Sequence, residues 1–144
     1  MIRLHGSSVA LAGAGVLLRG PSGAGKSDLA LRLIEAGARL VADDQVELHS
    51  SGEELLMRPP ENLAGLLEVR GLGILRFDHL AQAPLRLVVD LVPAEQVERM
   101  PEPETIELGG IILPLLRLTP WEASASTKVR LAVGVADGTI LCLR

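Results

Sequence analysis

The sequence predicts an α/β domain with a mixed β-sheet, and three observations support this fold class. Between Ser8 and Ala42 the chain reads as strand, glycine-rich loop, helix and strand, an order typical of α/β folds. Hydrophobic residues make up 48% of the chain, yet Trp121 and Phe77 are its only aromatic residues. The core is therefore aliphatic, as in sheets that are buried on both faces. Further strand candidates follow, so we expect a mixed sheet in a single domain over residues 1–144.

The elements of the first part follow from the spacing of apolar residues. Ser8–Leu18 predicts a strand or hairpin that leads into the glycine-rich loop. Helical spacing of leucine and isoleucine predicts a helix over Ser27–Ala36. Leu40–Ala42 is a short apolar strand, and Val46–His49 with Leu55–Arg58 predict the two arms of a hairpin.

The second part is richer in strand candidates. Leu85–Val92 predicts a strand, and Ala94–Met100 predicts one or two helical turns. Ile106–Leu118 and Val129–Val135 predict further apolar strands. Cys142 is expected to be a small buried hydrophobic residue near a strand end.

The glycine-rich loop has the strongest functional signal in the chain. It matches the pattern G-x-x-x-x-G-K-[ST] in full, with the residues Gly20, Pro21, Ser22, Gly23, Ala24, Gly25, Lys26 and Ser27. Glycines let successive backbone N–H groups turn towards phosphate oxygens, and the following helix adds the positive end of its dipole. Lys26 reaches the outer phosphates, and the Ser27 hydroxyl can ligate Mg²⁺. The loop therefore predicts binding of ATP or GTP.

Phosphoryl transfer also needs carboxylates, and the chain offers two places for them. Asp43 and Asp44 end the strand Leu40–Ala42, at the position where ligands gather in α/β sheets. Two adjacent carboxylates repel each other, which suits one of them to act as a base. Asp90 lies inside an apolar run instead, so we expect it on an exposed or edge face of a strand.

Composition excludes several other classes of protein. The net charge of −4 argues against a general nucleic-acid surface. Cys142 is the only cysteine, which leaves no internal disulfide and no cysteine-based zinc site. No apolar run is long enough to span a membrane, and no secretory signal is evident, so we expect a cytoplasmic protein.

Taken together, these segments resemble the catalytic domain of the HPr kinase/phosphorylase family. Asp43-Asp44 within Leu40–Val46 and the string Glu-Val-Arg-Gly-Leu-Gly-Ile over Glu68–Ile74 look like two hallmark segments of that family. The glycine-rich loop Gly20–Ser27, also called the phosphate loop below, and the upstream pair His5-Gly6 resemble that domain in order and spacing. The match is good over residues 4–75 and loose beyond them. The chain is similar to the short proteobacterial form, a bare catalytic domain.

The resemblance implies a fold, an activity and partners. The fold resembles the nucleotide-binding part of phosphoenolpyruvate carboxykinase. The family uses ATP and Mg²⁺ to phosphorylate a serine of HPr, the small phosphocarrier of the sugar phosphotransferase system. It also removes that phosphate by attack of inorganic phosphate, which releases pyrophosphate. Members are typically hexamers, and for this chain the partner is HPr or its nitrogen-branch homologue.

The resemblance also implies roles for single residues. Lys26 holds phosphates, Ser27 and Glu68 serve Mg²⁺, and Asp44 is the base that accepts the proton of the substrate serine. Asp43 supports the site.

The remaining implied roles lie at the two ends of the chain. His5 supports the site and aids the reverse reaction. The segment Thr119–Lys128 stands in place of the family's arginine-containing loop and closing helix, which makes Lys128 or Arg130 the candidate to replace that cation.

Two other functions remain open at this point. A small-molecule kinase with a phosphate loop is one, although the chain lacks an evident arginine-rich lid. A non-catalytic module that senses nucleotide and regulates a partner is the other.

Overall fold

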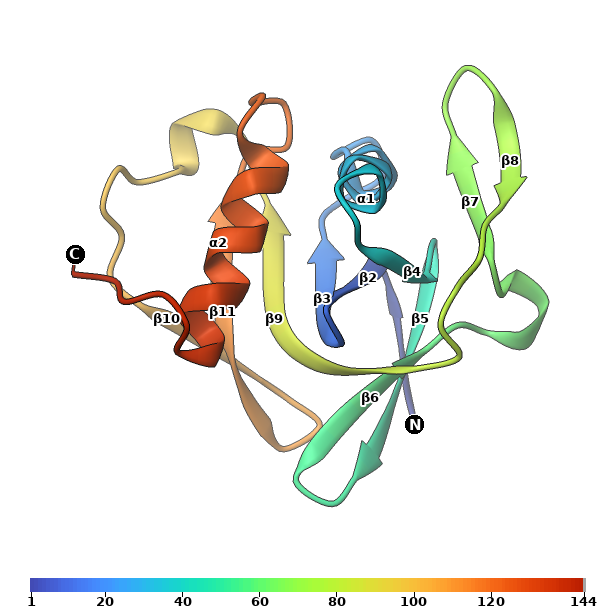
Figure 1. The fold of residues 1–144 in the computed structure, drawn as a ribbon, viewed down its shortest axis with the longest axis horizontal. Coiled ribbons are helices and arrows are strands. Elements are labelled where there is room, and N and C mark those ends of the chain that lie inside the picture. The colour runs from blue at the N-terminus through green and yellow to red at the C-terminus, as the bar shows by residue number, and fades with distance from the viewer. Residues whose placement is uncertain (144) are drawn as a thin grey trace.

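The computed structural model describes residues 1–143, in which two helices pack on one face of a curved mixed sheet (Figure 1). Within this part of the chain nine strands join one sheet, and β7 and β8 form a separate hairpin. The strands are β1 (Ile2–His5), β2 (Ser7–Leu11), β3 (Ala14–Arg19), β4 (Arg39–Ala42), β5 (Gln45–Ser51), β6 (Glu54–Arg58), β7 (Leu66–Val69), β8 (Gly73–Arg76), β9 (Ala83–Leu91), β10 (Glu104–Leu108) and β11 (Ile111–Leu118). The helices are α1 (Lys26–Glu35) and α2 (Ala125–Asp137), with short 3₁₀ turns at Glu61–Leu63 and Ala94–Gln96.

The direction of the central strands brings four loops to one edge of the sheet. The strand β3 pairs in parallel with β9, which pairs in parallel with β11 on its other side. The strand β2 is antiparallel to both β3 and β4, so β4 runs in the same direction as β3. The carboxyl ends of β3, β4, β9 and β11 therefore lie at the same edge, where ligands bind in open α/β sheets.

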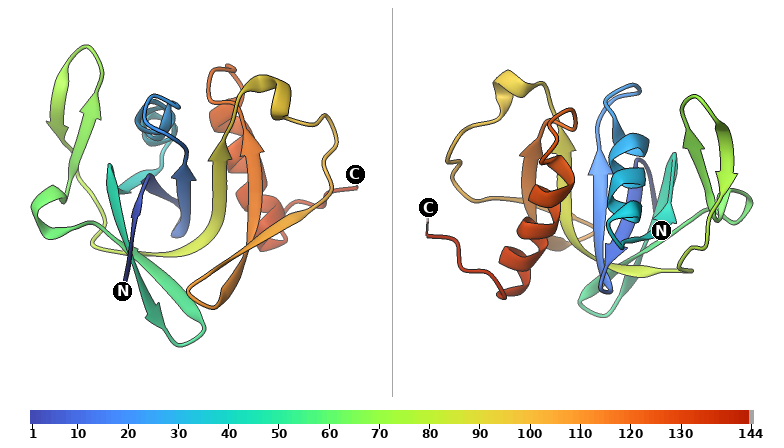
Figure 2. Two further views of the ribbon diagram at one scale, coloured as in Figure 1. Left: turned by 180° about the vertical axis from the view of Figure 1, so that it is seen from behind. Right: turned by 45° about the horizontal axis from the view of Figure 1, so that its top comes forward.

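The strand β9 links this parallel part to an antiparallel part. Its first residues pair with β6, with Ala83 opposite Met57, and β6, β5 and β1 continue the sheet by antiparallel pairing. Seen from behind, β9 and β11 pass in front of α2 (Figure 2). The mixed α/β sheet that the sequence predicts is confirmed.

Two apolar clusters fill the two faces of the sheet. The cluster under the helices contains alternate residues of β3 and β9, such as Val16, Leu18 and Val89. The cluster on the opposite face contains Leu17 and Val88 together with residues of β5 and β6. This alternation is the period-2 pattern of strands buried on both faces.

The helix α1 begins at the glycine-rich loop and ends as the sequence predicts. Leu29, Ala30 and Leu33 are fully buried against the sheet. The chain leaves the helix at Gly37, whose φ of +110° favours glycine, and the Ala38 N–H donates to the Leu33 carbonyl at 2.9 Å. The predicted strand Leu40–Ala42 and the hairpin of β5 and β6 are confirmed as well.

The prediction of a strand over Val129–Val135 is wrong, because this segment lies in α2. Its apolar residues fit both a period of two and a helical spacing. The structure selects the helical spacing: Val129 and Val133 are buried, whereas Leu131 and Val135 are 50% and 42% exposed. Packing of one helical face on the sheet outweighs the β propensity of valine.

Three smaller expectations also need correction. Ile106–Leu118 forms two strands, β10 and β11, that reverse at Gly109 and Gly110, both with positive φ. Cys142 is exposed. Asp90 lies inside its strand, but β9 is central and the carboxylate accepts two hydrogen bonds from Arg19 of the neighbouring β3, at 2.8 and 3.0 Å. Ion pairing explains how this carboxylate is accommodated in the middle of a sheet.

Candidate functional site

A cleft of about 260 Å³ opens where β3 and β4 end. It lies between the glycine-rich loop, the first turn of α1, the hairpin of β7 and β8, and the turn after β11. The residues that line it are His5, Ser7, Ser22, Gly23, Gly25, Lys26, Ser27, Asp28, Leu31, Asp43, Asp44, Glu68, Val69, Arg70 and Trp121.

The glycine-rich loop has a conformation that depends on its glycines. Gly23 and Gly25 have φ values of +83° and +98°, which residues with a Cβ rarely adopt. Gly25 caps α1, and its carbonyl accepts the first helical hydrogen bond from the Leu29 N–H at 2.9 Å. The free N–H groups at the start of α1 and the positive end of its dipole therefore face the cleft, which suits an anion.

Lys26 lies across this loop. Its side chain is buried, and Nζ donates to the carbonyl oxygens of Gly20 and Pro21 at 2.6 and 2.9 Å. Burial lowers the pKa of Lys26 from its ordinary value, although the charges of Asp43 and Asp44 oppose that shift. The loop thus holds a partly desolvated cation beside two carboxylates.

Asp43 is the centre of a buried hydrogen-bond network. Only 6% of the residue is exposed. Its Oδ1 accepts hydrogen bonds from Ser7 Oγ at 2.6 Å and Ser27 Oγ at 2.9 Å, and its Oδ2 accepts one from the Glu68 N–H at 3.3 Å. Four segments far apart in the sequence are therefore tied together by one carboxylate.

Asp44 occupies a strained turn directly after β4. Its φ is +69°, in the left-handed region that favours glycine, and the Gln45 N–H donates to the Asp43 carbonyl at 2.8 Å to close the turn. The Gly6 N–H donates to the Asp44 carbonyl at 3.1 Å and holds the turn in place. This backbone leaves the Asp44 side chain 64% exposed in the cleft. Strain of this kind is characteristic of functional sites.

His5 lies beside the same turn. Its Nδ1 is 3.0 Å from the Asp44 carbonyl oxygen and 3.6 Å from Asp44 Oδ1. A carbonyl oxygen only accepts hydrogen bonds, so Nδ1 carries the hydrogen in this arrangement and Nε2 remains available to another group. His5 and Asp44 therefore present two neighbouring polar side chains to the cleft.

Glu68 reaches the cleft from the hairpin of β7 and β8. Pairing of Glu68 with Ile74 sets the hairpin register, and the Leu72 N–H donates to the Val69 carbonyl at 2.9 Å in the turn. Gly71 and Gly73 have positive φ, which explains the glycines of this segment. The Glu68 carboxylate is exposed at the cleft while its backbone is bound to Asp43.

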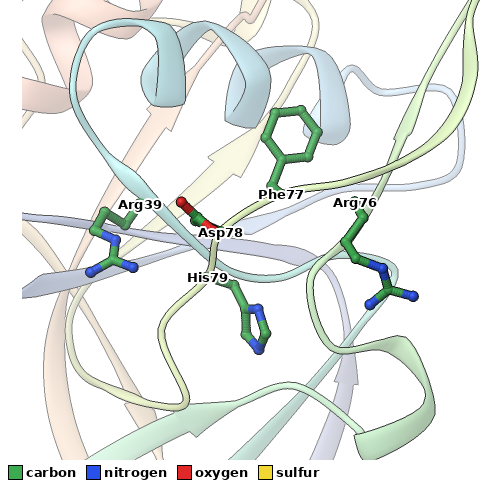
Figure 3. Close-up of a pocket in the computed structure, with 5 residues that line it drawn as sticks. All are labelled: Arg39, Arg76, Phe77, Asp78 and His79. Atoms are coloured by element: carbon green, nitrogen blue, oxygen red, sulfur yellow. The ribbon is translucent and has the colours of Figure 1, made fainter.

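A larger hollow of about 540 Å³ lies elsewhere, at the start of β4 and the end of β8 (Figure 3). It is lined by Arg39, Arg76, Phe77, Asp78 and His79. Figure 3 shows that the two arginine side chains lie apart, on either side of Asp78 and His79, and that the phenyl ring points away from both arginines. These side chains do not converge on one ligand position, so the smaller cleft is the better candidate for chemistry.

Comparison with known proteins agrees with this geometry. Residues 1–114 match the family model described as the HPr Serine kinase C-terminal domain. The chain belongs to this family. It is 39% identical to the HPr kinase/phosphorylase of Burkholderia lata and, equally, to that of Burkholderia cenocepacia, in matches that cover 98% of this chain and 47% of each relative. The chain thus spans about half the length of the curated relatives it matches.

A solved structure supports the fold. "Structure of the Hpr(Ser) kinase/phosphatase from Coxiella burnetii" superposes with a TM-score of 0.85 and covers 96% of this chain and 98% of that chain. The sequence identity is 23%, so this likeness supports the fold alone. Within residues 1–143, neither helix has the length and apolar character that crossing a membrane requires.

The cleft of this family member contains most of the residues that the sequence singles out. His5, Lys26, Asp44 and Glu68 line it together with Ser27, Asp43, Ser22, Gly23 and Gly25. Gly20, Pro21 and Ala24 shape the loop without lining the cleft. The catalytic and binding roles of all these residues stay predictions.

The C-terminal part differs from the expectation for it. A closing helix is present, since α2 covers Ala125–Asp137. Lys128 does not reach the cleft, because its Nζ bonds the Glu122 carboxylate at 3.3 Å, and Arg130 does not line the cleft either.

Four residues of the cleft were missed from the sequence, namely Ser7, Asp28, Leu31 and Trp121, and two of them have a clear structural part. Ser7 holds Asp43, and Trp121 stands against the glycine-rich loop. Ser7 gives a weak signal, a polar residue at the start of an apolar strand. Trp121 gives a stronger sequence signal, because a single tryptophan in a chain with almost no other aromatic residue indicates a specific role.

Proposed function

We propose that this chain is an ATP-dependent protein-serine kinase that phosphorylates the phosphocarrier HPr or its nitrogen-branch homologue, with residues 1–144 as one catalytic domain. One observation carries the proposal: Ser27 of the phosphate loop donates a 2.9 Å hydrogen bond to Asp43, beside Asp44, in one cleft. Relatives that are 39% identical to this chain over the matched part, which is 47% of their own length, are named HPr kinase/phosphorylase. We also propose the cytoplasm as the place of the reaction and a homo-oligomer, by family resemblance a hexamer, as its form.

The phosphate loop and Lys26 bind the nucleotide in this proposal. Backbone N–H groups around Gly23 and Gly25 and the start of α1 take up phosphate oxygens. Lys26 Nζ, which here bonds two loop carbonyls, exchanges those partners for the transferring phosphate. The cation offsets negative charge that moves onto the leaving ADP.

The oxygen atoms of the cleft fit Mg²⁺. In residues 1–143 no three His, Cys, Asp and Glu side chains form a cluster that could hold a metal on their own. Mg²⁺ bound with a nucleotide needs few protein ligands, because phosphates and water supply the others. Ser27, oriented by Asp43, and the exposed Glu68 are the groups that would hold it. When bound, Mg²⁺ neutralises phosphate charge and orients the terminal phosphate.

Asp44 is the general base of the proposed reaction. The substrate serine oxygen forms a bond to the terminal phosphorus, the bond from phosphorus to the ADP oxygen breaks, and the serine proton passes to Asp44. His5 Nδ1, 3.6 Å from Asp44 Oδ1, helps to hold that carboxylate. In the phosphorolysis reaction an oxygen of inorganic phosphate forms a bond to the phosphorus of phosphoserine, and the bond from phosphorus to the serine oxygen breaks. The proton of the attacking phosphate passes through Asp44 to that oxygen, so the products are serine and pyrophosphate.

A phosphotransfer experiment tests the proposal. The chain is incubated with Mg²⁺-ATP and with HPr or its nitrogen-branch homologue, and the intact mass of each carrier is measured. We expect one phosphate on the carrier and none on a carrier whose acceptor serine is replaced by alanine. Phosphate on a small molecule instead would indicate a small-molecule kinase. The absence of both transfer and hydrolysis would indicate a nucleotide-sensing module.

A further inference from the structure

The turn between β11 and α2 brings the only tryptophan of the chain against the phosphate loop. A Cβ built on Gly25 would lie 2.8 Å from Pro120 Cγ and 3.1 Å from Trp121 Cη2. The edge of the indole ring at Cη2 therefore lies close to Gly25, and Trp121 lines the same cleft as Lys26 and Ser27. Even so, 67% of Trp121 is exposed. Large aromatic side chains are mostly buried, so an open ring at a cleft suggests a ligand.

The backbone on both sides of Trp121 is fixed to α1. The Arg32 guanidinium donates through Nη2 to the Pro120 carbonyl and through Nη1 to the Glu122 carbonyl at 3.3 Å. Asp28, one turn earlier on α1, accepts a hydrogen bond from Arg32 Nε at 3.1 Å. The ring is thus carried by a turn that is already anchored. Binding of a ligand therefore costs less conformational entropy, because the turn need not be ordered first.

The arrangement of the strands sets the direction of a bound nucleotide. The carboxylates Asp43 and Asp44 follow β4, which lies on one side of β3 beyond β2. Trp121 follows β11, which lies on the opposite side of β3 beyond β9. A nucleotide whose terminal phosphate faces the carboxylates therefore extends its ribose and base towards Trp121. The ring occupies the side of the loop where a base would emerge.

We propose that Trp121 is the nucleobase platform of this cleft, with its indole ring stacked on the purine of ATP. The proposal rests on nucleotide binding by the phosphate loop and adds to it the site of the base. A stacking contact recognises the face of a ring rather than its edge groups, so it tolerates both adenine and guanine. The smaller rings of CTP and UTP overlap the indole less, and both bind more weakly.

Fluorescence and calorimetry on single variants test the platform. Because the chain has one tryptophan and no tyrosine, its tryptophan emission reports on Trp121 alone. Mg²⁺-ATP should change this emission, whereas Mg²⁺-tripolyphosphate, which has no base, should change it little. Trp121→Ala should weaken ATP binding by about 10-fold or more and leave tripolyphosphate binding within about 2-fold. Trp121→Phe keeps an aromatic face and should recover most of the ATP affinity.

A matched control is Ile112→Ala, which removes another exposed apolar side chain from the β11 region, away from the loop. It should bind both probes as the wild-type chain does. Thermal unfolding of each variant shows that it is folded.

The possible outcomes separate the platform from the proposed function. If the wild-type chain binds neither probe, the phosphate-loop function fails and the platform fails with it. If tripolyphosphate binds normally while Trp121→Ala keeps wild-type ATP affinity, the platform alone is overturned. Equal losses of ATP and tripolyphosphate in Trp121→Ala would also overturn it, since the ring would then support the loop rather than the base.

Discussion

The two sides of the phosphate loop are built in different ways. On the side of β4, side chains converge on Asp43, which is 6% exposed and accepts hydrogen bonds from three segments. On the side of β11, the Arg32 guanidinium donates to two backbone carbonyls, and Trp121 between them is 67% exposed. A buried side-chain network couples activity to stability, because each member supports the others. Replacement of an exposed ring on an anchored turn should change ligand affinity and leave stability nearly unchanged.

Replacement of Asp44, the proposed general base on the β4 side, should have the largest effect on phosphate transfer. Asp44→Asn keeps the size of the side chain and removes the proton acceptor, so single-turnover transfer should fall by about 10²–10⁴-fold. Nucleotide affinity, measured on the same variant, should persist. Joint loss of transfer and metal-dependent nucleotide affinity would assign Asp44 to the metal, and undiminished transfer would exclude an essential base.

Replacement of Lys26 in the phosphate loop should have the second largest effect on transfer. It sharpens the comparison because Lys26 lies between the two sides. Lys26→Met should lower transfer by about 10²–10³-fold through loss of charge stabilisation. Burial lowers the pKa of Lys26, which disfavours its charge in the folded state, whereas the hydrogen bonds from Nζ to the Gly20 and Pro21 carbonyls favour it. The two effects oppose each other, so the variant without nucleotide should melt close to the wild-type temperature. A variant that transfers phosphate at the wild-type rate would contradict the role given to the loop.

The buried network itself can be broken at its centre. Asp43→Asn turns one acceptor oxygen into an amide donor that faces the donors Ser7 and Ser27 or the Glu68 N–H. We expect the free energy of unfolding to fall by about 1–3 kcal/mol, measured by urea denaturation. The exposed Asp78→Asn is the control and should change it little. Equal stability of the two variants would mean that Asp43 does not organise this side.

The smallest effect is expected on the β11 side. Arg32→Ala removes the hydrogen bonds to Pro120 and Glu122 but leaves the Trp121 ring in place. We expect about 3-fold weaker ATP binding, with tripolyphosphate binding unchanged, by calorimetry. Arg3→Ala, which removes an exposed ion pair with Glu47, should leave both affinities intact. A larger effect of Arg32→Ala on tripolyphosphate than on ATP would contradict the separation of the two sides.

The same contrast explains what could be predicted from the sequence. The phosphate loop and the pair Asp43-Asp44 follow from local spacing, since a fixed backbone path demands particular residues in consecutive positions. The contacts of Ser7 and Trp121 arise from distant segments, and no local pattern encodes them. The strand predicted over Val129–Val135 failed for a related reason, because its apolar residues fit two periods and only packing on the sheet decides between them.

The turn at Asp44 also bears on how this protein responds to selection. With a φ of +69° the backbone at this position is less strained with glycine than with aspartate. The exposed Asp44 side chain contributes little packing, so its removal costs little stability. A screen for heat-resistant variants alone would therefore favour Asp44→Gly, the replacement that deletes the proposed base. A selection for more thermostable variants of this protein therefore has to measure phosphate transfer as well as melting temperature.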